Sequence, residues 1–167
     1  MNHRGAAILL LVMALSACSV SPHHPPVARA QPGATVTTQT GPDPKTAAAL
    51  VRIAQAFNNN YDGNNDGPVY DRWDARSQAV ISRAEYIRRH AECATAPQGP
   101  AHVEDAAPGP KGAWLVHYEI GGQQLTDYWY YIHRRWEFDL LLSNPSAARL
   151  YRLPFVRYAA QVGCQDR

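Results

Sequence analysis

The chain has 167 residues, carries a formal net charge of +2 and is 46% hydrophobic. Because its basic residues are scattered and nearly balanced by acidic ones, it offers no electrostatic footprint for nucleic acid, and we expect no nucleic-acid partner. The length accommodates one ordinary domain of roughly 125 residues behind an N-terminal extension.

Residues 1–17 have the composition of a secretory signal peptide. Arg4 stands near the start, an apolar run follows as far as Leu15, and Ser16 and Ala17 are small. An apolar run of this length is too short for a stable transmembrane helix. We therefore interpret the segment as a targeting signal that is removed from the mature protein.

Cys18 follows this signal directly, and Leu15-Ser16-Ala17-Cys18 resembles the bacterial lipobox. The resemblance implies that Cys18 receives a diacylglyceryl group and becomes the new N-terminus. Two or more acyl chains would then anchor the protein stably to a membrane, on the extracytoplasmic side of the cell envelope. The alternative is an ordinary secreted protein in which Cys18 has no such role.

The segment 18–42 is rich in Pro, Thr and Ser and lacks apolar periodicity. Such a composition cannot bury enough apolar surface to fold, so we expect a disordered tether. The tether would hold a single domain, residues 43–167, away from the membrane surface.

A helix is predicted at the start of this domain. Asp43 and Pro44 are a capping residue and a first-turn proline, and Gly63 marks the end of the helix. Its apolar face repeats at helical spacing. The residues of that face are Leu50, Ile53, Ala54, Phe57 and Tyr61.

The next stretch partly matches a calcium-binding loop. Asp62, Asn64 and Asp66 stand at the first three ligand positions of such a loop. The twelfth position, normally a bidentate Glu, is Trp73. We interpret the stretch as a turn rich in Asn, Asp and Gly that leads into a short helix over 68–73. A calcium-stabilised module is kept as an alternative.

Ser82 and Glu85 form a capping box, which predicts a third helix that ends just before Cys93. With Cys18 assigned to the lipid, Cys93 and Cys164 remain. The compartment beyond the membrane permits oxidation, so we predict a disulfide between them. Two free thiols with a catalytic role are the alternative, but no His or Asn pattern accompanies either cysteine.

After a predicted strand over 101–107, the chain enters an antiparallel meander that runs from Trp114 to Leu142. Gly121 and Gly122 separate two alternating runs, which is typical of a two-residue hairpin turn. The register that follows pairs Ile120 with Gln123, Tyr118 with Leu125, Val116 with Asp127, and Trp114 with Trp129.

One face of the meander is strongly apolar, and a third strand extends it with alternation at period two. Because Arg134-Arg135 is a poor primed turn, we expect a longer loop before that strand. The apolar face comprises Trp114, Val116, Tyr118, Ile120, Leu125, Trp129 and Tyr131, followed by Trp136, Phe138, Leu140 and Leu142.

Asp127 interrupts this apolar face. An unpaired buried charge is strongly destabilising, so its carboxylate must be hydrogen-bonded, protonated or open to a wet cavity. Two interpretations remain open. Asp127 is either a pocket acid or a structural residue bonded to a tyrosine hydroxyl, an indole N–H or an arginine.

Two short segments close the chain. Asn144 and Pro145 predict a helix through Leu150, again by cap and proline. We expect the segment 156–162 to be helical and to bring Cys164 to the end of the third helix.

Helices followed by a strand and a long antiparallel meander define an α+β fold, with N-terminal helices packed on a curved, cone-like antiparallel sheet. The segments WDARSQAVISRAEYIRRHAEC (Trp73–Cys93) and DYWYYIHRRWEFDL (Asp127–Leu140) resemble short bacterial lipoproteins of unassigned function with a nuclear transport factor 2-like domain. The resemblance implies a pocket between the concave sheet face and the first helix. Its expected lining is Trp114, Val116, Tyr118, Asp127, Trp129, Tyr131 and Phe138.

The sequence contains no metal triad, nucleophile elbow or phosphate-binding loop, so we expect no cofactor. We expect the domain to bind a small ligand or another protein, such as a second copy of the chain, without chemistry. Enzymes that share the fold place an acid in the cone for proton transfer. A general acid–base enzyme of the isomerase or dehydratase type, with Asp127 as its catalytic residue, is therefore the alternative.

Overall fold

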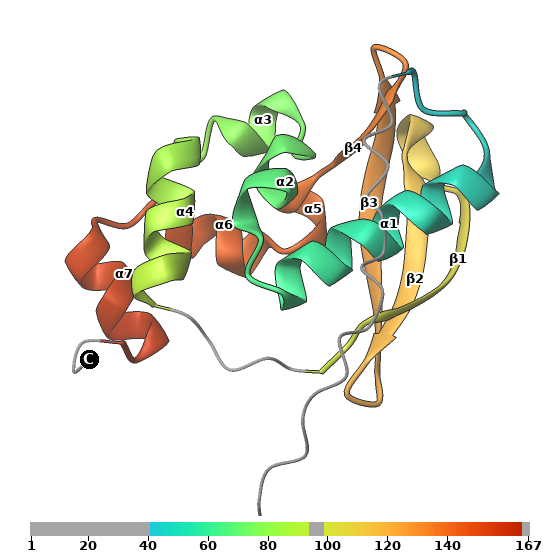
Figure 1. Ribbon diagram of the computed structural model, residues 1–167. Coiled ribbons are helices and arrows are strands. Elements are labelled where there is room, and N and C mark those ends of the chain that lie inside the picture. Colours follow the sequence, from blue (N-terminus) through green and yellow to red (C-terminus); the bar gives the residue numbers. More distant parts are fainter. Residues whose placement is uncertain (1–40, 94–98, 165–167) are drawn as a thin grey trace, which may run out of the picture. The chain divides into compact units, whose positions relative to one another are not determined.

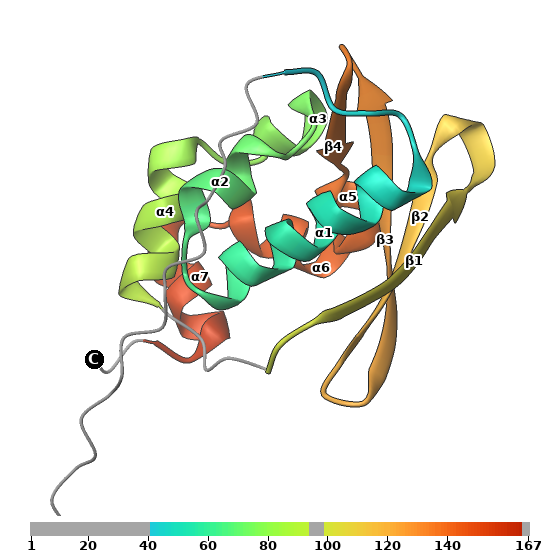
Figure 2. The same cartoon turned by 45° about the vertical axis from the view of Figure 1, so that its right-hand side comes forward.

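The computed structural model describes residues 41–93 and 99–164. The expected signal peptide, Cys18 and the tether up to residue 40 lie outside these residues. The described part is an α+β domain, as predicted: a helix lies across a curved, four-stranded antiparallel sheet, and shorter helices gather to one side (Figures 1 and 2). None of the helices in these two ranges combines the length and the apolar character that a membrane span needs.

Helix α1 (Ala47–Asp62) begins three residues after the predicted start. Thr46 caps it by accepting a hydrogen bond from the Ala49 amide at 3.2 Å, and Gly63 ends it. Asp43 was therefore wrongly predicted to be the cap. The side chains of Leu50, Ala54 and Phe57 are buried on the helix face that meets the sheet, as the apolar periodicity predicts.

Asp43 instead fastens the start of the domain to strand β4. Its carboxylate accepts a hydrogen bond from the Trp136 amide at 2.9 Å and pairs with Arg72 at 2.6 Å. Its amide donates to the Arg134 carbonyl at 3.0 Å. The Tyr131 hydroxyl donates to the Asp43 carbonyl at 2.5 Å. These partners all come from residues far away in the sequence, which is why local capping rules did not find them.

Three short helices follow: α2 (Asp66–Asp71), α3 (Ala75–Gln78) and α4 (Arg83–Glu92). The predicted cap of α4 is confirmed, since Ser82 Oγ accepts from the Glu85 amide at 3.3 Å. Helix α3 was not predicted. Asp74 caps it by accepting from the Ser77 amide at 2.7 Å.

The sheet consists of β1 (His102–Pro108), β2 (Trp114–Ile120), β3 (Gln123–Ile132) and β4 (Arg135–Phe138), in that spatial order. A short 3₁₀ turn, η1 (Pro110–Gly112), joins β1 to β2. The predicted register of β2 and β3 is confirmed at all four pairs, including Val116 opposite Asp127.

The connection between β3 and β4 is shorter than predicted. His133 and Arg134 form a two-residue turn with φ of 49° and 64°, so Ile132 pairs directly with Arg135. Turns of this kind usually take Asn or Gly, because other side chains are strained at positive φ. The bond from the Asp43 amide to the Arg134 carbonyl helps to hold the turn in place.

Strand β4 ends at Phe138, so the prediction that Leu140 and Leu142 continue the strand was wrong. Both belong to helix α5 (Leu140–Ser143), which Asp139 caps by accepting from the Leu142 amide at 3.0 Å. Leu140 is buried, whereas Leu142 is 48% exposed. A run of leucines fits both a strand and a helix by hydrophobicity, and here the cap decides between them.

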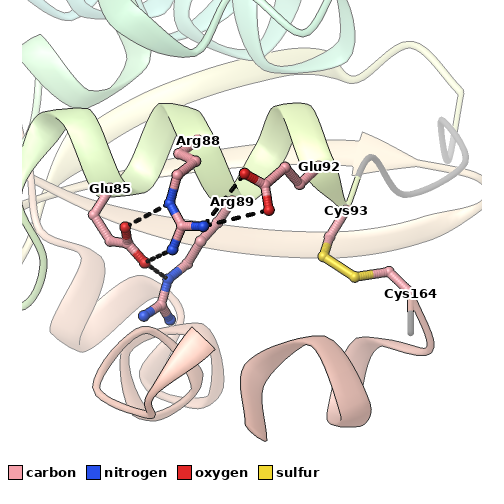
Figure 3. Close-up of a disulfide and its surroundings, with 6 residues drawn as sticks. All are labelled: Glu85, Arg88, Arg89, Glu92, Cys93 and Cys164. Carbon is pink, nitrogen blue, oxygen red and sulfur yellow. Dashed lines mark hydrogen bonds and ion pairs between the residues drawn. A yellow bond between two sulfur atoms is a disulfide. The ribbon is translucent and has the colours of Figure 1, made fainter. Parts of the chain in front are cut away.

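Helices α6 (Pro145–Tyr151) and α7 (Phe155–Val162) close the domain. The predicted Cys93–Cys164 disulfide is confirmed, with 5.3 Å between the Cα atoms (Figure 3). It joins the end of α4 to the residue that follows α7 and its terminal Gly163.

A buried guanidinium supports the same junction. Arg89 on α4 pairs with Glu85 at 2.7 Å (Figure 3) and donates to the carbonyl oxygens of Tyr151 and Leu153 at 3.3 and 2.8 Å. Tyr151 is the last residue of α6 and Leu153 lies just beyond it, so neither carbonyl has a partner within the helix. Arg89 therefore ties α4 to the α6–α7 connection.

The core lies between α1 and the concave face of the sheet. Trp129 and Trp136 are completely buried there. The ring of Phe57 on α1 lies 5.3 Å from Trp129 and 4.8 Å from Phe138. Aromatic contacts of this kind stabilise a core beyond the area that they bury.

Candidate functional site

A cavity of about 400 Å³, open to solvent, lies between the C-terminal half of α1, the sheet, and helices α4 to α6. The sheet contributes the end next to the β2–β3 turn, where Ile120 and Leu125 lie outside the packed core. Most of the wall is aromatic. The rings are those of Phe57, Tyr61, Trp73, Tyr86, Tyr118, Phe138 and Tyr151.

Asp127 is the buried acid of this wall. Strand alternation directs it to the concave face, opposite Val116, and it is only 6% exposed. Burial raises the pKa of Asp127 to about 7, against the smaller opposing effect of a hydrogen bond from the Tyr118 hydroxyl. A carboxyl group with this pKa can give or take a proton near neutral pH.

His90 forms a second polar group in the wall, together with Asp66 and Tyr151. Its Nε2 lies 2.8 Å from the Tyr151 hydroxyl, and its Nδ1 lies 3.0 Å from Oδ1 of Asp66. That carboxylate oxygen is not aligned for a hydrogen bond. Burial lowers the pKa of His90 and raises the pKa of Asp66, so both effects favour a neutral pair.

Two buried N–H groups in the wall have no hydrogen-bond partner within the described ranges. They are Nδ2 of Asn58 and Nε1 of Trp73. A buried donor without a partner is costly, and water or a ligand oxygen usually satisfies it. Both atoms are shielded from solvent, so they lie behind the surface of the cavity rather than on it.

The structure brings together only part of the lining expected from the sequence. Tyr118, Asp127 and Phe138 line the cavity. The other four residues lie deeper in the core or at the other end of the sheet. Val116 and Trp129 are fully buried, whereas Trp114 and Tyr131 pack against Trp136 at 5.3 and 5.0 Å.

The reason for this division is the path of α1. The helix covers the middle of the concave face, so only the end of the sheet beside the β2–β3 turn is left open. His90 is the main wall residue that the sequence analysis missed. It follows Tyr86 by four residues on α4, so both side chains lie on one helix face, and that spacing is the signal by which it could have been found.

The structure does not arrange the residues of the calcium-like loop around a common centre, because they belong to two helices and the turn between them. Asp62 ends α1, Asp66 begins α2, and Asn64 between them has a φ of 54°. The Asp66 side chain is buried against His90 rather than turned toward Asp62 or Asn64. Among residues 41–93 and 99–164, no group of three or more His, Cys, Asp or Glu side chains is placed to hold a metal ion.

A second hollow, of about 320 Å³, lies beside α3 and the β3–β4 turn. Its two arginines are already engaged. Arg76 pairs with Asp74 at 3.2 Å and with Asp139 at 2.6 Å, and Arg135 donates to the Asp71 carbonyl. The cavity around Asp127 is therefore the better candidate for a binding site.

Comparisons with known proteins add no relative to this description. No family model matches the sequence, no curated protein matches it, and no solved structure matches the fold.

Proposed function

We propose that this protein is a lipid-anchored envelope protein whose domain binds a small ligand in the cavity around Asp127. The observation that carries the proposal is the cavity itself. Its volume of about 400 Å³ falls within the range of small-molecule sites, and aromatic walls with a few convergent polar groups are typical of them.

The anchoring part of the proposal rests on the sequence. The lipobox-like Leu15–Cys18 and the Pro-, Thr- and Ser-rich segment that follows support a lipidated Cys18 and a tether. The disulfide between Cys93 and Cys164 supports an oxidising, extracytoplasmic location. A helix lying across a curved antiparallel sheet supports the resemblance to nuclear transport factor 2-like domains.

The test is native mass spectrometry of the full chain, purified from its own host in a non-ionic detergent. We expect a non-covalent adduct that is absent from Leu125→Trp, a variant that fills the mouth of the cavity. Gln124→Trp is the matched control, because the neighbouring side chain on β3 points to the opposite face of the sheet. An empty monomer would contradict the proposal, and an empty dimer would favour self-association instead.

Proton transfer by Asp127 is the second candidate function. It is favoured by a carboxyl group with a pKa of about 7, placed beside the Tyr118 hydroxyl in an accessible cavity. The ligand found by mass spectrometry provides the assay. Wild-type protein in D₂O should exchange an acidic C–H of that ligand for deuterium, and Asp127→Asn should not. Equal exchange by the two proteins would exclude Asp127 as the base.

A further inference from the structure

We propose that the ligand of this cavity is a cationic amine whose ammonium group pairs with Asp127, while its apolar groups lie against the aromatic walls. This inference rests on the proposed function, since it names the chemical class of ligand for the same site.

The first argument is the partner that Asp127 lacks. The buried acids among the described residues are Asp43, Asp66, Asp74, Asp127 and Asp139. Three of them have an arginine partner: Arg72 lies 2.6 Å from Asp43, and Arg76 lies 3.2 Å from Asp74 and 2.6 Å from Asp139. Asp66 lies 3.0 Å from His90, in a pair that favours the neutral forms.

Asp127 is the exception, because its interacting side chain is the Tyr118 hydroxyl. A buried carboxylate without a cation is unfavourable, and for Asp43, Asp74 and Asp139 an arginine of this chain supplies the cation. The position of Asp127 in a cavity wall means that a ligand can supply it instead.

The second argument is the composition of the wall. Its charged or titratable members near neutral pH are Asp62, His90 and Asp127, and none of the described lining residues is Lys or Arg. The site is therefore unsuited to an anion. The wall also holds the rings of Tyr61 and Tyr118, and electron-rich rings of this kind attract ammonium groups most strongly where water is excluded.

The test compares amines with neutral isosteres of the same shape. The probes are choline against 3,3-dimethylbutan-1-ol, and acetylcholine against 3,3-dimethylbutyl acetate. Each is titrated calorimetrically into the full chain in a non-ionic detergent. The titrations are run at about pH 8, where the Asp127 carboxyl is largely ionised. We expect at least one amine to bind at least about tenfold more tightly than its isostere. This comparison needs no variant.

Asp127→Asn should remove the preference for the amine while leaving the affinity for the isostere within about twofold. Asp105→Asn is the matched control. It removes the same charge from strand β1, two strands away in the same sheet, where the Asp105 side chain is 65% exposed and pairs with His117. The control should bind both members of each pair as the wild type does.

The remaining outcomes separate the two proposals. If the isosteres bind as tightly as the amines, or if Asp127→Asn keeps the preference, the amine inference fails and the cavity remains a ligand site. If no probe binds but native mass spectrometry shows a ligand, the inference again fails alone. If no probe binds and the protein is empty in the mass spectrometer, the proposed function fails as well.

Discussion

Replacing Asp127 with Asn is expected to stabilise the folded protein above neutral pH. Burial raises the folded-state pKa of Asp127 from its ordinary value of 3.8 to about 7. Between these values the native state holds a proton that the unfolded chain has released. Stability is therefore greatest below the unfolded-state pKa and falls as the pH rises through the folded-state pKa. Asn carries no such charge, so the variant avoids this loss.

The magnitude follows from the difference between the two pKa values. About 3 pH units, at roughly 1.36 kcal/mol per unit, give a ceiling of about 4 kcal/mol at pH 8. Water in the open cavity reduces this ceiling. The amide also accepts a weaker hydrogen bond from Tyr118 than a carboxylate does, which costs about 1 kcal/mol. We expect a net gain of about 1–3 kcal/mol at pH 8 and no gain at pH 4.

Urea denaturation of the wild type, Asp127→Asn and Asp105→Asn at pH 4, 6 and 8 measures this effect. The wild type and the exposed control should lose stability between pH 4 and pH 8 relative to Asp127→Asn. If the free energy of unfolding of Asp127→Asn follows the same pH dependence as that of the wild type, the side chain is not a buried acid with a raised pKa. Both the catalytic alternative and the amine site would then lose their physical basis.

Three further changes test the scaffold. Reducing the Cys93–Cys164 disulfide, which links residues 71 apart, should lower the melting temperature by an amount equivalent to about 4 kcal/mol, and two free thiols in the untreated protein would contradict the bond. Arg89→Met should lower the free energy of unfolding, measured by urea denaturation, by about 3 kcal/mol because it leaves buried carbonyls unpaired. Arg88→Met, on the exposed side of the same helix, should lower it by less than about 1 kcal/mol. Equal losses would argue against the buried role of Arg89. Arg134→Gly should raise the stability by about 1 kcal/mol by relieving its positive φ of 64°, and a lower melting temperature would refute this explanation.

The pairing of β2 with β3 was predictable because residues within the hairpin itself determine it. Gly121 and Gly122 define the turn between β2 and β3, and alternation then fixes every pair of that hairpin, including the position of Asp127 on the concave face. The capping box of α4 is local in the same sense. These signals lie within a few residues of the structure that they specify.

Two of the mispredicted parts, the cap of α1 and the β3–β4 turn, depend on distant contacts. Asp43 has the features of a helix cap, yet Arg72 and the Trp136 amide compete for its carboxylate. The turn at His133 and Arg134 contradicts local preference and is held by a bond to the start of the domain. A sequence pattern ranks local alternatives, but it does not contain the partner that decides between them.

The residues of the candidate site were likewise only partly predictable from the sequence. Asp127 was noticeable as one polar residue on an apolar face, and the structure places it in a cavity wall. Asn58 could not be assigned to that wall, because nothing in the sequence states how α1 meets the sheet. For His90 the signal was its four-residue spacing from Tyr86, which places both side chains on one face of α4. The cavity is formed where packing ends, and that boundary depends on the path of α1 across the sheet.

The fastening of Asp43 has a mechanical consequence. With the proposed lipid at Cys18, a force along the chain from the membrane would reach Asp43, which is fastened to the sheet near the start of the described residues. There the load passes directly to Arg72, to the Arg134 carbonyl and to the Trp136 amide, at the β3–β4 end of the sheet. The cavity opens at the opposite end of β3. Drag on the domain would therefore be borne by the β3–β4 hairpin, and the shape of the cavity would be insulated from movements of the membrane.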